Sequence, residues 1–240
     1  KVVTDEGVEG VCTVGDWRYT ELSWQQIATL RELAVGEDPL DRDRLWSKLS
    51  AASRFLNPVW WGGFDNCLWD IAGKVAGKPV AELLGGARSS AAAYFNTAGS
   101  SIDELIRDGE IGLEAGYSTL KDHLAFSNAE NINAFERFRS AFGAEVGLMH
   151  DAALASYNYE EAIEVGRALE STGFIWFEEP IDDRLHQQNV QLCQLLDIPI
   201  AGAETLMHDP QLGELWLTTG AVDILRVHAR HGTTAVQRLA

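Results

Sequence analysis

Polar residues recur at a steady interval along the second half of the chain, and each follows or ends a short apolar stretch. They are His123, Asp151, Glu178, Glu204 and His228, separated by 28, 27, 26 and 24 residues. An interval of this length fits one strand, one helix and two short connections. Because the carboxyl ends of parallel strands lie at the same edge of a sheet, these five side chains are predicted to meet there.

The apolar stretches read as strands that alternate with amphipathic helices. We expect strands over 92–99, 118–124, 145–152, 173–180, 198–205 and 222–228. Helices are expected between them, for instance over 101–116, 128–143 and 158–173. In a doubly wound sheet only one or two strands reach the ligand, whereas five consecutive polar strand ends favour an α/β fold of the modified TIM (β/α) barrel type. The chain supplies six strands, so we expect the barrel to be incomplete in this chain.

Residues 1–88 have a different pattern and are expected to form an N-terminal α+β capping domain, followed by the barrel domain at 89–240 with strands one to six. A short strand and turn open this part. Helical patterns follow over 23–36, 38–55 and 64–86, with Ser23 as the expected N-cap of the first. The segment 55–65 is rich in aromatic residues, Gly and Pro, and is expected to be a loop. Its Trp60 and Trp61 fit either a lining of the pocket or the core.

The chain of 240 residues is acidic, with a formal net charge of −17. Such a surface repels phosphate backbones and anionic lipid, so no nucleic acid and no membrane partner is expected. No apolar run approaches the roughly 18 residues of a membrane span. Cys12, Cys67 and Cys193 are widely spaced and form no disulfide or metal-binding motif, which favours a cytoplasmic location.

Three of the five recurring residues are carboxylates, namely Asp151, Glu178 and Glu204. Carboxylates that crowd together in the ionised form need a compensating cation. Hard oxygen ligands with room for water fit Mg²⁺, and no cluster of Cys and His competes for zinc. The pattern therefore predicts a Mg²⁺ site; the alternative is that each acid is an ordinary surface residue beyond a strand end.

Several motifs follow one another in a fixed order: VVTDEGVEGV, GEDPLDRDRLW and DNCLWDIAGKVAGKPVAELLGG, then GYSTLKDH, LMHDAA, FEEP, GAET and VDILRVH. Together they resemble the enolase superfamily, in its mandelate racemase and muconate-lactonising branch. The resemblance implies one essential Mg²⁺, held by Asp151, Glu178 and Glu204. It also implies abstraction of the proton α to the carboxylate of a small-molecule substrate, through an enolate that the ion stabilises. Family members are often symmetric oligomers, so the resemblance leaves open whether this chain forms a homo-oligomer.

Lys121 and His123 stand two apart on one predicted strand, so their side chains share a face. The family commonly has Lys-x-Lys here. The resemblance assigns Lys121 to the electrostatic tuning of its partner near the substrate carboxylate, and His123 to proton transfer, for which imidazole is suited near neutral pH. The alternative for His123 is a core histidine bonded to a backbone carbonyl. Asp122 should point the other way and needs a partner, and His150 is also expected to face away.

The family places Lys or Asp where this chain has His228. Three roles stay open for His228: a catalyst on the opposite face of the substrate, a hydrogen-bond partner for a residue outside these strands, or a structural residue. His231 is the second candidate if the register shifts. Arg226 should share the face of His228 and bind a substrate carboxylate. Glu179 is expected to support the site rather than to bind metal.

These residues favour dehydration of an acid sugar, in which one group removes the α-proton and a conjugate acid expels the β-hydroxyl as water. Histidine chemistry fits this reaction better than the lactonising branch, which typically pairs two lysines across the substrate. The first alternative is a racemase or epimerase of a 2-substituted carboxylic acid, with His123 and His228 on opposite faces. The second is a member that binds metal without catalysis, since Ala153 replaces the Asn that the family often has two residues after the first acid.

Overall fold

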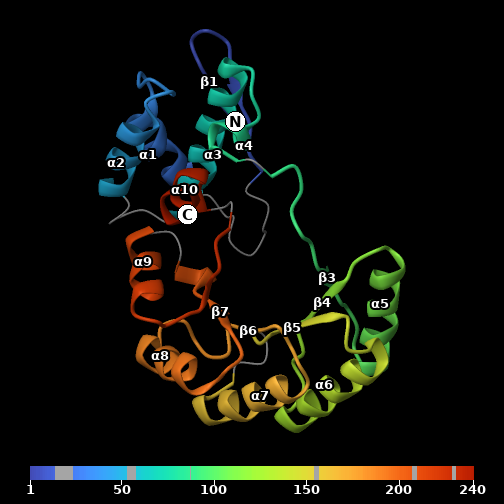
Figure 1. Cartoon of the computed structure of the whole chain (residues 1–240). Helices are drawn as coiled ribbons and strands as arrows, with labels where there is room; N and C mark the ends of the chain where they lie inside the picture. The colour runs from blue at the N-terminus through green and yellow to red at the C-terminus, as the bar shows by residue number, and fades with distance from the viewer. Residues whose placement is uncertain (14–23, 53–57, 87, 154–156, 207–209, 229–230) are drawn as a thin grey trace. The chain divides into compact units, whose positions relative to one another are not determined.

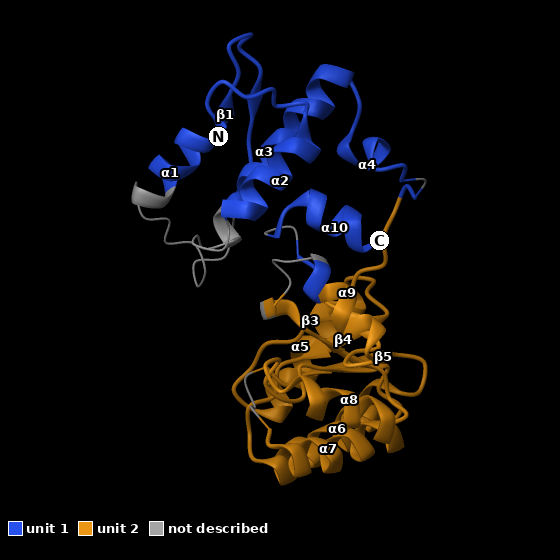
Figure 2. Ribbon diagram, turned by 90° about the vertical axis from the view of Figure 1, so that its left-hand side faces the viewer, with its two compact units in different colours: residues 1–89, 207–212, 227–240 blue, residues 90–206, 213–226 orange. Residues whose placement is uncertain are grey.

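The computed structural model describes residues 1–13, 24–52, 58–86, 88–153, 157–206, 210–228 and 231–240. The chain forms two compact units (Figures 1 and 2). The first unit comprises residues 1–89, 207–212 and 227–240, and the second comprises residues 90–206 and 213–226. The expected N-cap Ser23 and the side chain of Trp60 lie outside the described part.

The second unit contains a six-stranded parallel sheet whose strand order follows the chain. Its strands are β3 (Phe95–Asn96), β4 (Thr119–Asp122), β5 (Gly147–Asp151), β6 (Trp176–Glu178), β7 (Ile200–Gly202) and β8 (Ile224–Leu225). Sequential pairing of this kind is that of a (β/α) barrel and differs from a doubly wound sheet, in which the strand order reverses. The prediction of a modified barrel with six strands in this chain is confirmed.

Helices cover the outer side of this sheet (Figure 1). They are α5 (Ile102–Glu114), α6 (Asn128–Phe142), α7 (Tyr159–Ser171), α8 (His186–Leu195) and α9 (Pro210–Thr218). The first three lie within two residues of the predicted bounds, because their start signals are strong. Reciprocal capping boxes begin α6, with Ser127 and Glu130, and α7, with Asn158 and Glu161.

The core of the second unit lies between the sheet and these helices. Phe135 and Leu169 from the helices meet Phe177 and Ile200 from the strands, and all four are fully buried. Burial of each such side chain stabilises the fold by about 2 kcal/mol. The core therefore packs against the outer face of the strands, and the residues at their carboxyl ends are not part of it.

The strands are shorter than predicted, and some of the recurring polar residues fall just beyond them. Asp151 and Glu178 end β5 and β6, whereas His123 follows β4 and Glu204 begins the 3₁₀ turn η1 (Glu204–Leu206). Ala203, with φ of 68°, interrupts the extended backbone before Glu204. The strand ends therefore bend at the edge where the polar side chains stand.

The first unit combines an antiparallel pair of strands with helices. The strands are β1 (Val2–Val3) and β2 (Glu9–Gly10). The helices are α1 (Trp24–Ala34), α2 (Arg42–Ala52), α3 (Pro58–Ala76), α4 (Val80–Leu83) and α10 (Thr233–Leu239). Leu45, Trp46, Leu49, Phe64 and Leu68 form its core.

Two expectations for this unit were wrong. The segment 64–86 is not one helix, because Gly77 takes a left-handed φ of 63° and Pro79 follows, so α3 ends before α4 begins. The described part of segment 55–65 is helical rather than a loop, since Pro58 occupies the first position of α3, where a missing N–H costs nothing. Trp61 is a core residue, with its ring centroid 4.3 Å from that of Trp46.

Helix α10 belongs to the first unit, although the predicted division placed it with the barrel at 89–240. Buried Asp65 explains this difference, because it accepts hydrogen bonds from the N–H and the hydroxyl of Thr234, both at 2.7 Å. The same hydroxyl accepts a hydrogen bond from the indole N–H of Trp69 at 2.9 Å. The C-terminal helix α10 is therefore hydrogen-bonded to α3. No local sequence pattern predicts this contact, because the two segments lie far apart in the sequence.

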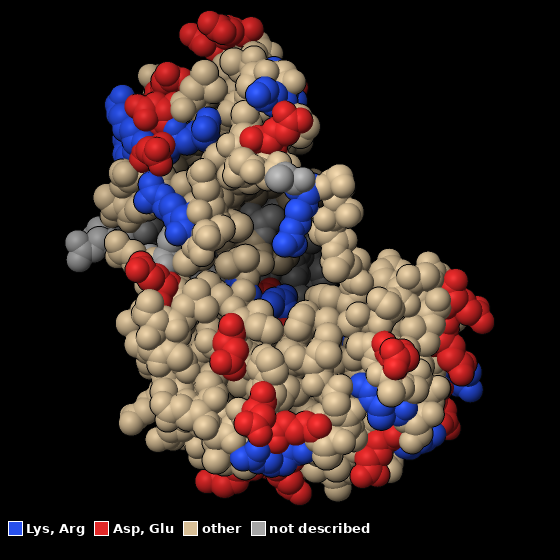
Figure 3. Space-filling view, viewed as in Figure 1, with Lys and Arg blue, Asp and Glu red and all other residues tan. Residues whose placement is uncertain are grey.

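Charge is mixed on the face of the molecule shown in Figure 3, where acidic side chains are widespread and basic ones stand between them. Within the described residues, no helix is long and apolar enough to cross a membrane.

Substitution of Thr234 by Val is expected to lower the free energy of unfolding by about 2 kcal/mol, because it leaves the buried Asp65 carboxylate with one donor fewer. Urea denaturation measures this loss. Thr218→Val is the matched control, since the exposed Thr218 hydroxyl bonds only carbonyls of its own helix; it should change stability by less than about 0.5 kcal/mol. Equal losses in both variants would contradict the role given to Thr234.

Candidate active site

The site residues stand at the carboxyl edge of the six-stranded sheet. In the register of neighbouring strands, Asp122 lies opposite His150, and Asp151 lies opposite Glu178. Partners in a parallel ladder leave the sheet at the same level. The pairing of β4, β5 and β6 therefore brings together side chains that are far apart in the sequence.

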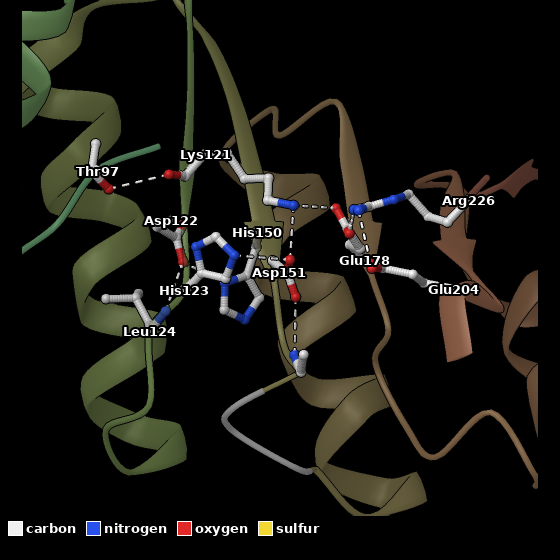
Figure 4. Close-up of polar contacts among 11 residues, drawn as sticks. Thr97, Lys121, Asp122, His123, Leu124, His150, Asp151, Glu178, Glu204 and Arg226 are labelled. Carbon is white, nitrogen blue, oxygen red and sulfur yellow. Dashed lines mark hydrogen bonds and ion pairs between the residues drawn. The ribbon is translucent and has the colours of Figure 1, made fainter. Parts of the chain in front are cut away.

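Lys121 lies at the centre of this group. Its Nζ is 2.8 Å from Oδ2 of Asp151 and 2.8 Å from Oε2 of Glu178 (Figure 4). All three side chains are buried, with Lys121 only 3% exposed. A buried carboxylate without a partner is strongly unfavourable, so the shared ammonium stabilises both acids in this buried position.

Arg226 extends the group to the third carboxylate. One guanidinium nitrogen contacts Oε1 of Glu178, and Nη2 lies 2.8 Å from Oε2 of Glu204. The sequence led us to expect Arg226 as a ligand of the substrate, and here it pairs with two predicted metal ligands (Figure 4). Three carboxylates are thus interleaved with two cationic side chains.

His123 is the most exposed member of the group. Its Nε2 lies 3.1 Å from Oδ2 of Asp151, and 34% of its side chain is exposed. Because a carboxylate can only accept, Nε2 carries a proton in this arrangement. The partner is a side chain of the site and not the backbone carbonyl of the alternative interpretation. A small molecule can reach His123, whereas Lys121 is covered.

Two acids at this edge, Asp151 and Glu179, differ in protonation. Burial by itself raises the pKa of the Asp151 carboxyl, but the hydrogen bond from His123 and the charge of Lys121 outweigh it and hold the pKa below its usual value. For Glu179, burial and the negative charges of Asp183 and Asp151 raise the pKa to about 8. Ionised and neutral acids therefore stand side by side at this edge, a feature typical of active sites.

The backbone is strained beside the carboxylates. Among the described residues, those other than glycine with a positive φ are Glu179, at 48°, and Ala203, at 68°. Asp183 holds the second of them, since its Oδ1 accepts a hydrogen bond of 3.0 Å from the Ala203 N–H. Strain of this kind costs on the order of 1–3 kcal/mol and occurs preferentially at functional sites.

Sequence reasoning did not identify Asp183 or the neutral state of Glu179. The doubled acid in FEEP could have drawn attention to Glu179, because two adjacent carboxylates at a buried strand end cannot both be solvated. For Asp183 no local signal exists, since its partner Ala203 is supplied by the following strand.

His228 and His231 belong to the first compact unit. The N–H of His228 donates to Nδ1 of His231 at 3.3 Å, and the N–H of His231 donates to the carbonyl of His228 at 2.9 Å. The two histidines thus form one turn. The role of His228 as a catalyst stays a prediction.

The donor set fits a hard divalent cation in its chemistry. Asp151, Glu178 and Glu204 supply carboxylate oxygens, which are the ligands that such an ion prefers. As the described side chains stand, no three acidic, His or Cys groups converge to hold an ion, because Lys121 and Arg226 lie between the acids. An ion of charge +2 would supply the same compensation as these two cations.

Two family models match the chain. Residues 1–85 match the N-terminal domain of mandelate racemase and muconate lactonizing enzyme, and residues 106–240 match the enolase C-terminal domain-like family. The chain belongs to the mandelate racemase and muconate lactonizing enzyme branch of the enolase superfamily. The resemblance drawn from the motifs is confirmed.

Curated relatives of this superfamily member include sugar-acid dehydratases. The chain is 34% identical over 220 residues to L-talarate/galactarate dehydratase of Salmonella typhimurium, covering 84% of the chain and 53% of that protein. It is 34% identical over 208 residues to arabinonate dehydratase of Saccharolobus solfataricus, covering 82% of the chain and 55% of that protein. The chain thus spans about half the length of these relatives.

Solved structures show the same fold. D-glucarate dehydratase from Agrobacterium tumefaciens, complexed with magnesium, superimposes with a TM-score of 0.87 at 29% identity. That match covers 99% of the present chain and 66% of the other. The fold of this chain is therefore shared with part of a longer protein.

Removal of the central ammonium tests the electrostatic account of the site. Lys121→Met is expected to lower the free energy of unfolding of the metal-free protein by about 3 kcal/mol, because two buried carboxylates lose their shared partner. Urea denaturation measures the loss. Lys74→Met is the control, since it breaks a half-exposed ion pair with Asp70 worth less than about 1 kcal/mol. Similar losses for the two variants would show that the Lys121 contacts contribute no more than a surface pair.

Proposed function

We propose that this chain is part of a Mg²⁺-dependent lyase that dehydrates an acid sugar. The observation that carries the proposal is the accessible imidazole of His123, which stands beside the buried carboxylates of Asp151 and Glu178 and the ammonium of Lys121. Relatives named as dehydratases of galactarate, arabinonate and glucarate support the reaction class.

Asp151, Glu178 and Glu204 are the residues that would hold the ion. When bound, Mg²⁺ supplies positive charge that stabilises the charge developing on the substrate carboxylate. To hold the ion, these carboxylates would give up part of their contacts with Lys121 and Arg226. Arg226, whose side chain is partly exposed, is then free to bind a carboxylate of the substrate, as its position in the sequence predicted.

His123 is the group proposed to move protons. Its imidazole takes the proton from the carbon next to the substrate carboxylate, which breaks that C–H bond. Lys121 is buried and cannot exchange with substrate freely, so its ammonium stabilises negative charge and positions its neighbours. This division follows from exposure, since 34% of His123 is accessible and 3% of Lys121 is.

The second half of the reaction breaks the bond between the β-carbon and its hydroxyl group. The hydroxyl leaves with a proton from a conjugate acid, so one H and one OH depart as water. The remaining enol becomes a 2-keto acid. No oxidant or further reactant is needed.

Racemisation or epimerisation at the same carbon requires a second proton-transfer group on the opposite face. His228 is the residue that the sequence suggests for it. An incubation in D₂O separates the two reactions: a 2-keto acid product supports dehydration, and recovered substrate with deuterium at a scrambled α-carbon supports epimerisation.

His123→Asn is expected to reduce the rate of 2-keto acid formation from an accepted acid sugar by a factor of about 10² to 10⁴, because Asn cannot transfer a proton at neutral pH. Galactarate, arabinonate and glucarate in the presence of Mg²⁺ are the first substrates to assay. His186→Asn is the matched control, since half-buried His186 opens α8 and bonds Thr219 outside the group.

Full turnover by His123→Asn would overturn the assignment of the base. Mg²⁺ binding without turnover of any acid sugar or 2-substituted acid would instead support the reading of a metal-binding member without catalysis. A variant with normal Mg²⁺ binding and lost turnover supports the proposal.

A further inference from the structure

A second row of polar side chains lies behind the site, on the helix-facing side of the same strand ends. Asp122 stands between Lys121 and His123, and His150 directly precedes Asp151. Alternation along a strand turns Asp122 and His150 away from the site. Both are buried, with His150 at 0% exposed. Neither residue has a part in the proposed chemistry, so their burial needs another explanation.

Asp122 and His150 bind each other across the two strands. Nδ1 of His150 lies 2.6 Å from Oδ1 of Asp122, and the two residues are partners in the register of β4 and β5. The same Oδ1 accepts a hydrogen bond of 3.1 Å from the N–H of Leu124. Asp122 thus holds the backbone at Leu124, the residue that follows His123, beyond the end of β4.

The pair is anchored to two helices. Nε2 of His150 lies 3.1 Å from the hydroxyl of Tyr157, which precedes α7. The Nδ2 amide group of Asn131, on α6, donates to that hydroxyl at 2.6 Å. Each donor in this order meets an acceptor: amide to phenol, phenol to imidazole, imidazole to carboxylate. The network therefore joins both strand ends to the helix layer.

Aromatic rings enclose the network. The ring of Phe177, the residue before Glu178, stacks on His150 with centroids 5.6 Å apart. Phe135 of α6 meets His150 edge to face at 4.9 Å. Hydrogen bonds in such an apolar, water-free setting are strong when satisfied, and a missing partner is costly. The network thus has little freedom to rearrange.

We propose that Asp122, His150 and Tyr157 are positioning residues that fix the strand ends carrying Lys121, His123 and Asp151. Their hydrogen bonds set the separation of β4 and β5 at the catalytic edge and hold Leu124 after His123. The expected effect of these residues on Mg²⁺ binding rests on the proposed function. Their expected effect on the backbone does not depend on that function.

The test compares Asp122→Ala and Tyr157→Phe with Arg139→Met. Arg139 lies on α6, like Asn131, but its guanidinium bonds backbone carbonyls of Thr172, Gly173 and Val146, before β6 and β5 begin. The control therefore loses partly exposed hydrogen bonds at the opposite edge of the same strands. Three quantities are measured for each folded variant: the melting temperature, the Mg²⁺ dissociation constant by calorimetry, and hydrogen exchange over residues 118–126 and 147–153.

We expect Asp122→Ala to weaken Mg²⁺ binding about tenfold, in the range found when residues that orient metal ligands are removed, and Tyr157→Phe to weaken it less. Exchange over 118–126 should accelerate in both, with Leu124 most affected in Asp122→Ala. Arg139→Met should keep the parent affinity and the parent exchange in these segments, even where it melts at a lower temperature.

Unchanged exchange and affinity in Tyr157→Phe and Asp122→Ala would overturn the proposal, as would equal changes in Arg139→Met. If the parent chain binds no Mg²⁺, the proposed function fails, and hydrogen exchange alone then decides whether the network positions the strand ends. Should Asp122→Ala not fold, Tyr157→Phe decides, because it removes one hydroxyl and keeps the ring.

Discussion

The site depends on the placement of positive charge among three carboxylates. Lys121 reaches two of them from a buried position, and Arg226 reaches the third together with Glu178. Without these cations the crowding of carboxylates at this sheet edge would be strongly unfavourable. The same requirement makes the edge suited to a divalent ion, which brings equal charge and leaves coordination positions for a substrate carboxylate. An acidic protein can in this way bind an acidic ligand.

Because side chains alternate along a strand, the two sides of the sheet carry different groups. Lys121 and His123 face the site, and Asp122 between them faces the helices. The side that faces the helices holds a buried hydrogen-bond network in aromatic surroundings, and the other side holds the charges. Rigid support on one side and strained, charged groups on the other are what a preorganised site requires.

The repeated strand-end residues were sufficient to predict the sheet, its order and the edge at which the carboxylates stand, because one βα unit recurs at a nearly constant length. Contacts between distant segments could not be predicted in the same way. Asp65 and Thr234 are hydrogen-bonded although 169 residues separate them in the sequence. Arg226 forms ion pairs with Glu178 and Glu204, two of the predicted metal ligands. The prediction of a loop over 55–65 was wrong because proline is compatible both with a loop and with the start of a helix, and Pro58 begins α3.

Calorimetric titration of Mg²⁺ into the chain and into Glu178→Gln tests the central claim most directly. Glu178 is the carboxylate shared by Lys121 and Arg226, and its charge is the one the ion would need most. The account predicts one ion bound per chain, and binding at least about tenfold weaker in the folded Glu178→Gln variant. Absence of binding to the folded parent chain, or equal affinity in the two proteins, would contradict it.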